Sequence, residues 1–244
     1  MKKIIVFIFL LNLVFGFANL CFANNNYNEL TTEQLYNLLE NTDYVIIDVR
    51  SKLEYLCGCI KNAISTPQRR SDFSKIPKNK KIIFYCANIR CNDAKNSAKS
   101  AIAQGFENVY VYSGGYEEWL EKKMPITKII DTSKIDKTEI ISVKSGDLEK
   151  NKNDYIILDF LNDEKYGKIK DAIIIEFNNL DELKKKIKKL KKTKKKILAY
   201  HLTENLSKLS AEVLISTNLL PKKEIYYLES GLLAWLATGR KTEQ

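Results

Sequence analysis

The sequence predicts an α/β protein of two tandem domains, each a mainly parallel sheet flanked by helices. Three observations carry this prediction: the chain contains an internal repeat, each repeat holds short apolar runs typical of buried strands, and helical stretches separate those runs. The 244 residues are enough for two domains of about 100 residues each. The composition, 45% hydrophobic and 29% charged, is that of a folded globular protein rather than a disordered one.

The repeat consists of four sequence blocks that occur twice in the same order. DYVIIDVR at 43–50 returns as DYIILDFL at 154–161, and GCIKNAI at 58–64 returns as GKIKDAI at 167–173. KKIIFYC at 80–86 is matched by KKILAYH at 195–201, and NVYVYSGGYEEW at 108–119 by EIYYLESGLLAW at 224–235. Such an ordered series indicates a tandem duplication. We therefore expect a first domain over 28–128, a second over 139–242, and a linker at about 128–138.

The elements of the first repeat can be assigned in order. The runs VIID, IIFYC and VYVY are almost continuously apolar, as strands buried on both faces are. The stretch TTEQLYNLLEN, with Thr31 or Thr32 as N-cap, and the stretch NDAKNSAKSAIAQG, closed by Gly105, are typical of helices. Because strands alternate with helices, the sheet should be parallel, and ligands should bind beyond the carboxyl ends of its strands.

The first 23 residues, 1–23, have the layout of a secretory signal peptide. A basic pair precedes an apolar run at 4–18, and small residues allow cleavage after Ala23. We therefore expect a periplasmic or secreted mature protein, with an uncleaved N-terminal membrane anchor as the alternative. Cleavage leaves four cysteines, Cys57, Cys59, Cys86 and Cys91. In an oxidising compartment they can form disulfides or serve redox or sulfur chemistry.

The formal net charge is +10, and much of it lies in the run Lys184–Lys196. Leu183, Ile187 and Leu190 recur at helical spacing within this region, which predicts a basic amphipathic helix. The lysines form either a solvated face or a contact for an anionic surface or an acidic protein. Nucleic acid is not expected as a partner, because the chain is predicted to be exported and no aromatic residues interrupt the lysines.

Cys86 is the residue on which chemistry is expected. It ends the strand IIFYC, and a short polar loop separates it from a helix that begins near Asn92 or Asp93. A helix N-terminus favours a thiolate over a thiol, and Arg90 adds to this effect if it points inward. The alternative is an inert buried cysteine at a strand end.

Together these motifs resemble a known family. The series IIDVR, EYLCGCIKNAI, IIFYC with a six-residue loop, GFENVYVYSGGYEEW and MPI is similar to a rhodanese-type sulfurtransferase domain. The resemblance covers about residues 30–127 well and about 139–240 more weakly, which implies tandem rhodanese-like domains.

The resemblance implies a mechanism centred on Cys86. Its thiolate would take sulfur from a small sulfur-containing donor such as thiosulfate or polysulfide, form a persulfide, and pass the sulfur to a thiol acceptor, with no metal or organic cofactor. The loop would bind substrate through its backbone N–H groups, which come from Ala87, Asn88, Ile89, Arg90 and Cys91.

Three further residues are expected to support the site rather than to react. Asp48 and Arg50 match family positions that brace the loop, and Glu54 is expected to pair with Arg50.

Several positions depart from the family pattern. Ile89 replaces a glycine that is common in the loop, and Cys59 replaces the usual histidine, giving a Cys57-Gly58-Cys59 motif without the further ligands of a tetrahedral metal site. The loop is one residue shorter than in rhodanese-fold phosphatases. Cys91 either fills the position that closes the loop or attacks a persulfide on Cys86, which would release sulfide and leave a disulfide.

The second repeat has His201 where the first has Cys86, and Leu161 where the first has Arg50. Imidazole cannot form a persulfide, so the second domain is expected to be inactive. Three functions compete: an exported sulfurtransferase, a thiol-disulfide redox protein that uses Cys86 and Cys91, and a non-catalytic sulfur-carrier or protein-binding module.

Overall fold

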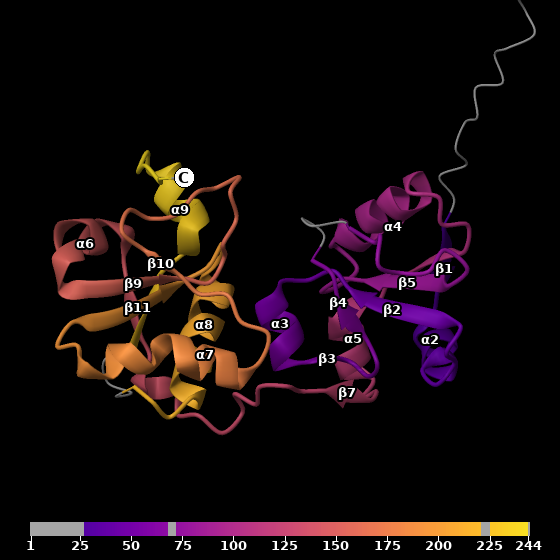
Figure 1. Cartoon of the computed structure of the whole chain (residues 1–244), viewed down its shortest axis with the longest axis horizontal. Helices are drawn as coiled ribbons and strands as arrows, with labels where there is room; N and C mark the ends of the chain where they lie inside the picture. The colour runs from indigo at the N-terminus through magenta and orange to yellow at the C-terminus, as the bar shows by residue number, and fades with distance from the viewer. Residues whose placement is uncertain (1–26, 68–71, 221–224, 244) are drawn as a thin grey trace, which may run out of the picture.

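Two parallel sheets, one in each half of the chain, form the framework of the protein, as the computed structural model in Figure 1 shows. The structure describes residues 27–67, 72–220 and 225–243. The expected signal peptide at 1–23 lies outside these residues. Within the part that is described, no helix combines the length and the apolar character needed to cross a membrane.

The first sheet contains five strands in the order β1-β6-β5-β2-β4, and all neighbouring pairs are parallel. Its strands are β1 (Asn28–Leu30), β2 (Tyr44–Asp48), β4 (Ile64–Ser65), β5 (Lys81–Tyr85) and β6 (Val109–Tyr112). A separate antiparallel pair joins β3 (Cys59–Ile60) to β7 (Ile126–Thr127). The predicted strands VIID, IIFYC and VYVY are therefore confirmed as the centre of a parallel sheet.

Helices cover both faces of this sheet. Helix α4 (Asp93–Ala103) covers one face, and α2 (Thr32–Leu38) and α5 (Gly115–Glu121) cover the other. Helix α3 (Lys52–Cys57) instead packs against the second domain. Thr31 caps α2 in a capping box with Gln34, and Gly105 follows α4 with φ +87°, as the sequence predicted. Along β5, alternate side chains face opposite helices, so that Phe84 and Cys86 share a cluster with α4 while Tyr85 lies in the cluster of α2 and α5.

The second domain repeats this arrangement. Its sheet has the order β10-β9-β11-β12-β8, again with parallel pairs. The strands are β8 (Ile141–Val143), β9 (Tyr155–Asp159), β10 (Ile173–Ile174), β11 (Lys196–Tyr200) and β12 (Ile225–Leu228). The helical elements are η2 (Lys137–Glu139), α6 (Ser145–Lys150), η3 (Lys152–Asp154), α7 (Leu180–Ile187), η4 (Lys188–Lys192), α8 (Glu204–Ser216) and α9 (Gly231–Ala237).

The lysine-rich run is helical over only part of the predicted length. The α-helix α7 ends at Ile187 and a 3₁₀ segment, η4, continues to Lys192, after which β11 begins at Lys196. The strand takes the end of the run because KKILAY repeats the sequence of β5. The predicted inner face is confirmed, since Leu183, Ile187 and Leu190 are all buried.

Helix α3 joins the two domains. Its residues Leu53 and Leu56 are buried in a hydrophobic cluster made mostly by the second domain, including Val213 and Leu214 of α8. Figure 1 shows α3 on the side of the first domain that faces the second. The linker takes part as well: the N–H groups of Ile129 and Ile130 both donate to the Leu56 carbonyl, and Ile130 is buried.

Candidate active site at Cys86

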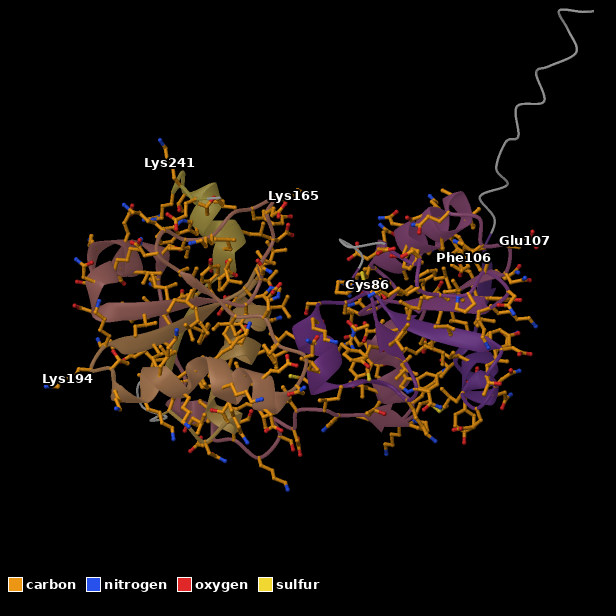
Figure 2. The ribbon with its side chains drawn as sticks, viewed as in Figure 1. Cys86, Phe106, Glu107, Lys165, Lys194 and Lys241 are labelled. Atoms are coloured by element: carbon orange, nitrogen blue, oxygen red, sulfur yellow. A yellow bond between two sulfur atoms is a disulfide. The ribbon has the colours of Figure 1, made fainter. Side chains whose placement is uncertain are left out.

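Cys86 follows the last residue of β5 directly and is 4% exposed. Because β5 is parallel to its neighbours, this position is at the carboxyl edge of the sheet, where the sequence placed the chemistry. Residues 86–92 form the loop that leads into α4. In Figure 2 Cys86 lies on the side of the first domain nearer to the second.

Asn88 folds this loop back on itself. Its side-chain Oδ1 accepts the N–H of Arg90 at 3.1 Å, and its carbonyl accepts the N–H of Cys91 at 3.0 Å. Asparagine favours such turns because its short side chain hydrogen-bonds the backbone two residues further on. The turn returns the chain to Cys86 without any positive φ between 86 and 92, so Ile89 is tolerated where the family often has glycine.

The two loop cysteines are joined by a disulfide. Cys86 and Cys91 have Cα atoms 6.2 Å apart, a common spacing for a bridged pair. Of the two roles that the sequence left open for Cys91, the structure favours the one in which its sulfur reaches Cys86. In this state neither sulfur is a nucleophile, so chemistry at Cys86 begins with reduction.

The expected substrate-binding residues do not all face the sulfur. The N–H groups of Arg90 and Cys91 bond to Asn88, so in this oxidised state they are not available to stabilise an anion at Cys86. The side chains of Ile89 and Arg90 are exposed, whereas Ala87 is half-buried. The predicted inward contribution of Arg90 is therefore not seen.

Helix α5 holds the base of the loop. The N–H of Tyr116 donates to the Cys86 carbonyl and the N–H of Glu117 to the Ala87 carbonyl, both at 2.9 Å. Gly115 makes this approach feasible, because its φ is +69° and a Cβ built on it would lie 2.7 Å from the backbone N of Asn88. The orphan N–H groups of one helix terminus thus fix the position of the loop.

A buried ion pair between Asp48 and Arg50 lies beneath the loop at the end of the neighbouring strand β2. Asp48 is fully buried and accepts three side-chain bonds from Arg50, including Nη2 to Oδ2 at 2.6 Å, and one from the Tyr85 hydroxyl at 2.6 Å. Burial alone would lower the pKa of Arg50, but the charge and hydrogen bonds of Asp48 outweigh it and raise the pKa above its ordinary value. Arg50 therefore stays charged, and the supporting role predicted for both residues fits this geometry.

Arg50 also reaches the elements around the loop. Its Nη2 donates to the Gly58 carbonyl at 2.6 Å, and its guanidinium lies 3.9 Å from the ring centroid of Tyr116. The expected pairing with Glu54 is not present. Instead the Glu54 carboxylate accepts the hydroxyl and N–H of Ser51 in a capping box at the start of α3.

Asp93 is a site residue that the sequence did not reveal as such. Its carboxylate and the sulfurs of Cys86 and Cys91 offer ligand atoms that all lie within 4.8 Å of one another. The two sulfurs are bonded to each other, which leaves no thiolate to bind a metal in this state. In the sequence Asp93 only marked the start of a helix, because its distance from the sulfurs depends on how tightly Asn88 turns the loop.

Among the described residues two further thiols, half-buried Cys57 and buried Cys59, have the properties of unreactive groups. Burial, followed by the charge of Glu212, raises the pKa of Cys57 to about 12. Burial, followed by the charge of Asp48, raises the pKa of Cys59 to about 11. Both remain protonated near neutral pH and are therefore poor nucleophiles.

The second domain preserves the frame of the site without its loop. Tyr200 donates to Asp159 at 2.7 Å, as Tyr85 does to Asp48, and Gly231 has φ +68°. However, only residues 201–203 separate β11 from α8, and buried His201 accepts the N–H of Leu202 at Nδ1. This short connection has no room for a loop like 86–92.

Comparison with known proteins supports the interpretation of both halves. The family described as "Rhodanese-like domain" matches residues 31–122 and again 144–238. Among curated proteins, the tRNA uridine(34) hydroxylase of Buchnera aphidicola is 37% identical over 101 residues, 38% of this chain and 31% of the relative. The thiosulfate sulfurtransferase GlpE of Glaesserella parasuis is 24% identical over 102 residues, 41% of this chain and 93% of the relative. The chain thus spans under a third of the first relative.

Two solved structures also align with this chain. The BH2092 protein of Bacillus halodurans aligns with 26% identity and a TM-score of 0.40, over 41% of this chain and 77% of that one. EanB aligns with 16% identity and a TM-score of 0.46, over 89% of this chain and 62% of that one. With the family matched twice, on either side of the linker, the chain belongs to the rhodanese-like family and carries two copies of its domain.

Proposed function

We propose that this protein is an exported sulfurtransferase in which reduced Cys86 accepts a sulfane sulfur from thiosulfate or polysulfide and passes it to a thiol acceptor. The observation that carries the proposal is the position of Cys86 at the carboxyl edge of a rhodanese-type sheet, in a loop held by the N-terminus of α5. Family membership supports sulfur transfer or related chemistry. The signal-like sequence at 1–23 supports export.

The chemistry needs only groups that the chain supplies. Reduced Cys86 attacks the outer sulfur of the donor, the donor's S–S bond breaks, and the remaining donor fragment leaves with the electron pair. The start of α4 places its partial positive charge near the loop and stabilises the anionic sulfur. The second domain, with His201 in place of Cys86, serves as a support rather than a second site.

The tRNA-modifying activity named for the hydroxylase relatives is not part of the proposal. The matched segment is 31% of the length of the Buchnera protein, and this chain begins with an export-type sequence. GlpE, which the chain matches over 93% of that protein's length, is named as a thiosulfate sulfurtransferase and supports the choice of donor class.

The second candidate is a thiol-disulfide redox protein. The Cys86–Cys91 disulfide favours it, because two thiols that can join within a loop can also exchange with an external disulfide. On this hypothesis the protein carries electrons and no sulfur atom.

Intact-mass measurement separates the two functions. We expect the reduced Cys91→Ser variant to gain one sulfur atom from thiosulfate or polysulfide, on the peptide that contains residue 86, and the Cys86→Ser variant to gain none. Cys59→Ser is the matched control, because that protonated thiol should not contribute. If neither donor adds sulfur while the wild-type loop cycles between dithiol and disulfide, the redox function is favoured instead.

A further inference from the structure

We propose that Cys91 completes the reaction inside the protein, so that the transferred sulfur leaves as hydrogen sulfide and the external partner is a dithiol reductant. This inference rests on the proposed loading of Cys86 and concerns the step after it. The protein would then act as a sulfane-sulfur reductase rather than hand sulfur to an acceptor.

The loop geometry carries the inference. Asn88 draws Cys91 back until its sulfur bonds that of Cys86, while α5 holds the Cys86 carbonyl in place. A thiol this close would attack a persulfide on Cys86 faster than an external acceptor could, because the step is intramolecular. If the protein only transferred sulfur, this attack would inactivate it in every cycle.

The step balances in atoms and electrons. The Cys91 thiolate attacks the inner sulfur of the Cys86 persulfide, the Sγ–Sγ bond forms, and the bond to the outer sulfur breaks. The outer sulfur leaves as hydrosulfide with the electron pair. It is reduced by two electrons, which come from the two cysteine sulfurs as they become the disulfide. A dithiol then reduces that disulfide and is itself oxidised to a cyclic or protein disulfide.

Asp93 is placed to manage the proton. Its carboxylate lies within 4.8 Å of both sulfurs and is solvent-exposed, so it can take the Cys91 proton, directly or through a water molecule, as that thiol attacks. The outgoing hydrosulfide leaves toward solvent on the same side. Asp93→Asn should therefore slow sulfide release near neutral pH and recover at alkaline pH, where the Cys91 thiol ionises without help.

The exposure of the loop indicates where the reductant attacks. Cys86 is 4% exposed whereas Cys91 is half-buried, so the accessible sulfur of the disulfide is that of Cys91. Attack there releases Cys86 as the free thiolate, ready for the next donor. Ile89 is 73% exposed at the tip of the same loop and offers an apolar contact to a partner protein.

The test is a single turnover with reduced protein, in the absence of oxygen and of added thiol. Thiosulfate is the donor, because it yields one sulfite on loading and so separates loading from resolution. For the wild type we expect one sulfite and one sulfide per chain, and a final mass of the unmodified disulfide. For Cys91→Ser we expect one sulfite, no sulfide, and a mass higher by one sulfur atom. Glutathione persulfide is used if thiosulfate fails to load the variant.

The two proposals fail in different ways. If Cys91→Ser gains no sulfur from either donor, the proposed sulfurtransferase function is wrong. If Cys91→Ser is loaded and the wild type keeps the persulfide equally long, loading is correct and the role of Cys91 as the resolving thiol is wrong. Addition of dithiothreitol should restore wild-type turnover, and a turnover that needs no dithiol would also overturn the inference.

A separate observation concerns the lysine-rich surface, which consists of the lysines between 184 and 195 on α7, η4 and the residues before β11. Among the described residues, none of these lysines forms an ion pair. Figure 2 places Lys194 at the end of the second domain that is remote from Cys86. The contacts therefore give no role for the positive charge of these lysines in stabilising the fold.

We infer that this lysine-rich surface adsorbs to an anionic lipid bilayer. Its apolar residues Leu183, Ile187 and Leu190 are buried in the protein, and no large apolar side chain is exposed along α7 or η4. Protein interfaces usually depend on aromatic or apolar anchors, which this surface lacks, whereas diffuse attraction to lipid head groups needs only charge.

Vesicle co-sedimentation tests this inference. Wild type should bind vesicles that contain phosphatidylglycerol, not neutral phosphatidylcholine, and salt should release it. A variant with Lys185, Lys188, Lys189 and Lys192 changed to Ser should bind about a thousandfold more weakly, because each lysine near an anionic surface contributes about 1 kcal/mol. The matched control changes Lys75, Lys99, Lys134 and Lys150 to Ser. Equal weakening of both variants, or preference for polyglutamate over the vesicles, would overturn the lipid assignment.

Discussion

Arg50→Met should lower the free energy of unfolding by about 3–5 kcal/mol, because it leaves the carboxylate of Asp48 buried without its counter-ion. Asp48 is fully buried and Arg50 is 7% exposed, so water cannot take the place of the lost guanidinium. The Tyr85 hydroxyl and the N–H of residue 50 would be the donors that remain. Denaturant unfolding monitored by tryptophan fluorescence measures this loss.

The double variant Asp48→Asn, Arg50→Met is the matched control. It removes both charges, so it should recover part of the stability that the single change loses. The second domain keeps the buried Asp159 beside Leu161, which stands in the place of Arg50, but it supplies that carboxylate with the N–H groups of both Leu161 and Asn162. Asp48 has only the backbone N–H of Arg50, because the N–H of Ser51 bonds to Glu54. Equal stability losses in the single and double variants would show that the buried charge is not the cause.

Gly115→Ala should both destabilise the protein and abolish loading of Cys86. The alanine Cβ would lie 2.7 Å from backbone atoms of Asn88, so the 86–91 loop would have to move away from α5. The positive φ of +69° adds about 1–3 kcal/mol of backbone strain. Persulfide formation on the Cys91→Ser background, measured together with denaturant unfolding, reports both effects.

Alanine variants of two other glycines separate the effect of backbone strain from the effect of the clash with the 86–91 loop. Gly105→Ala has a similar positive φ but its Cβ would meet nothing within 4 Å, so it should show the strain alone and keep full loading. Gly231→Ala would place its Cβ 2.5 Å from the backbone of Thr203 in the second domain, so it should destabilise the protein and still load Cys86. Loss of loading in Gly231→Ala would mean that the effect at Gly115 is not local.

The sequence predicted the parts of the fold that depend on local pattern. The strands were recognised because β2, β5 and β6 are apolar on both faces, and the repeat supplied the second sheet by analogy. The position of Cys86 followed from the end of β5. The length of the basic helix was overestimated because a charge pattern continued into residues that the repeat had already identified as a strand.

The predictions about the site that failed concern side chains with more than one possible hydrogen-bonding or ionic partner. Glu54 was expected to neutralise Arg50, but Ser51 lies three residues before it and forms a capping box, a signal that was present in the sequence. Asp48 is the partner of Arg50 because both side chains leave the same strand end. The proximity of Asp93 to the sulfurs could not be predicted, since it depends on how tightly Asn88 turns the loop.

Because α3 packs in the core of the second domain, the boundary between the two sequence repeats does not separate two independent hydrophobic cores. Leu53, Leu56 and Ile130 fill a core that the second copy cannot complete alone, and the first copy would expose them if it were separated. The two copies thus share one apolar core, and the copy without a cysteine buries apolar side chains of the other. Dissection of this protein therefore requires point variants in the full chain, because truncation at the linker would remove a shared core along with a domain.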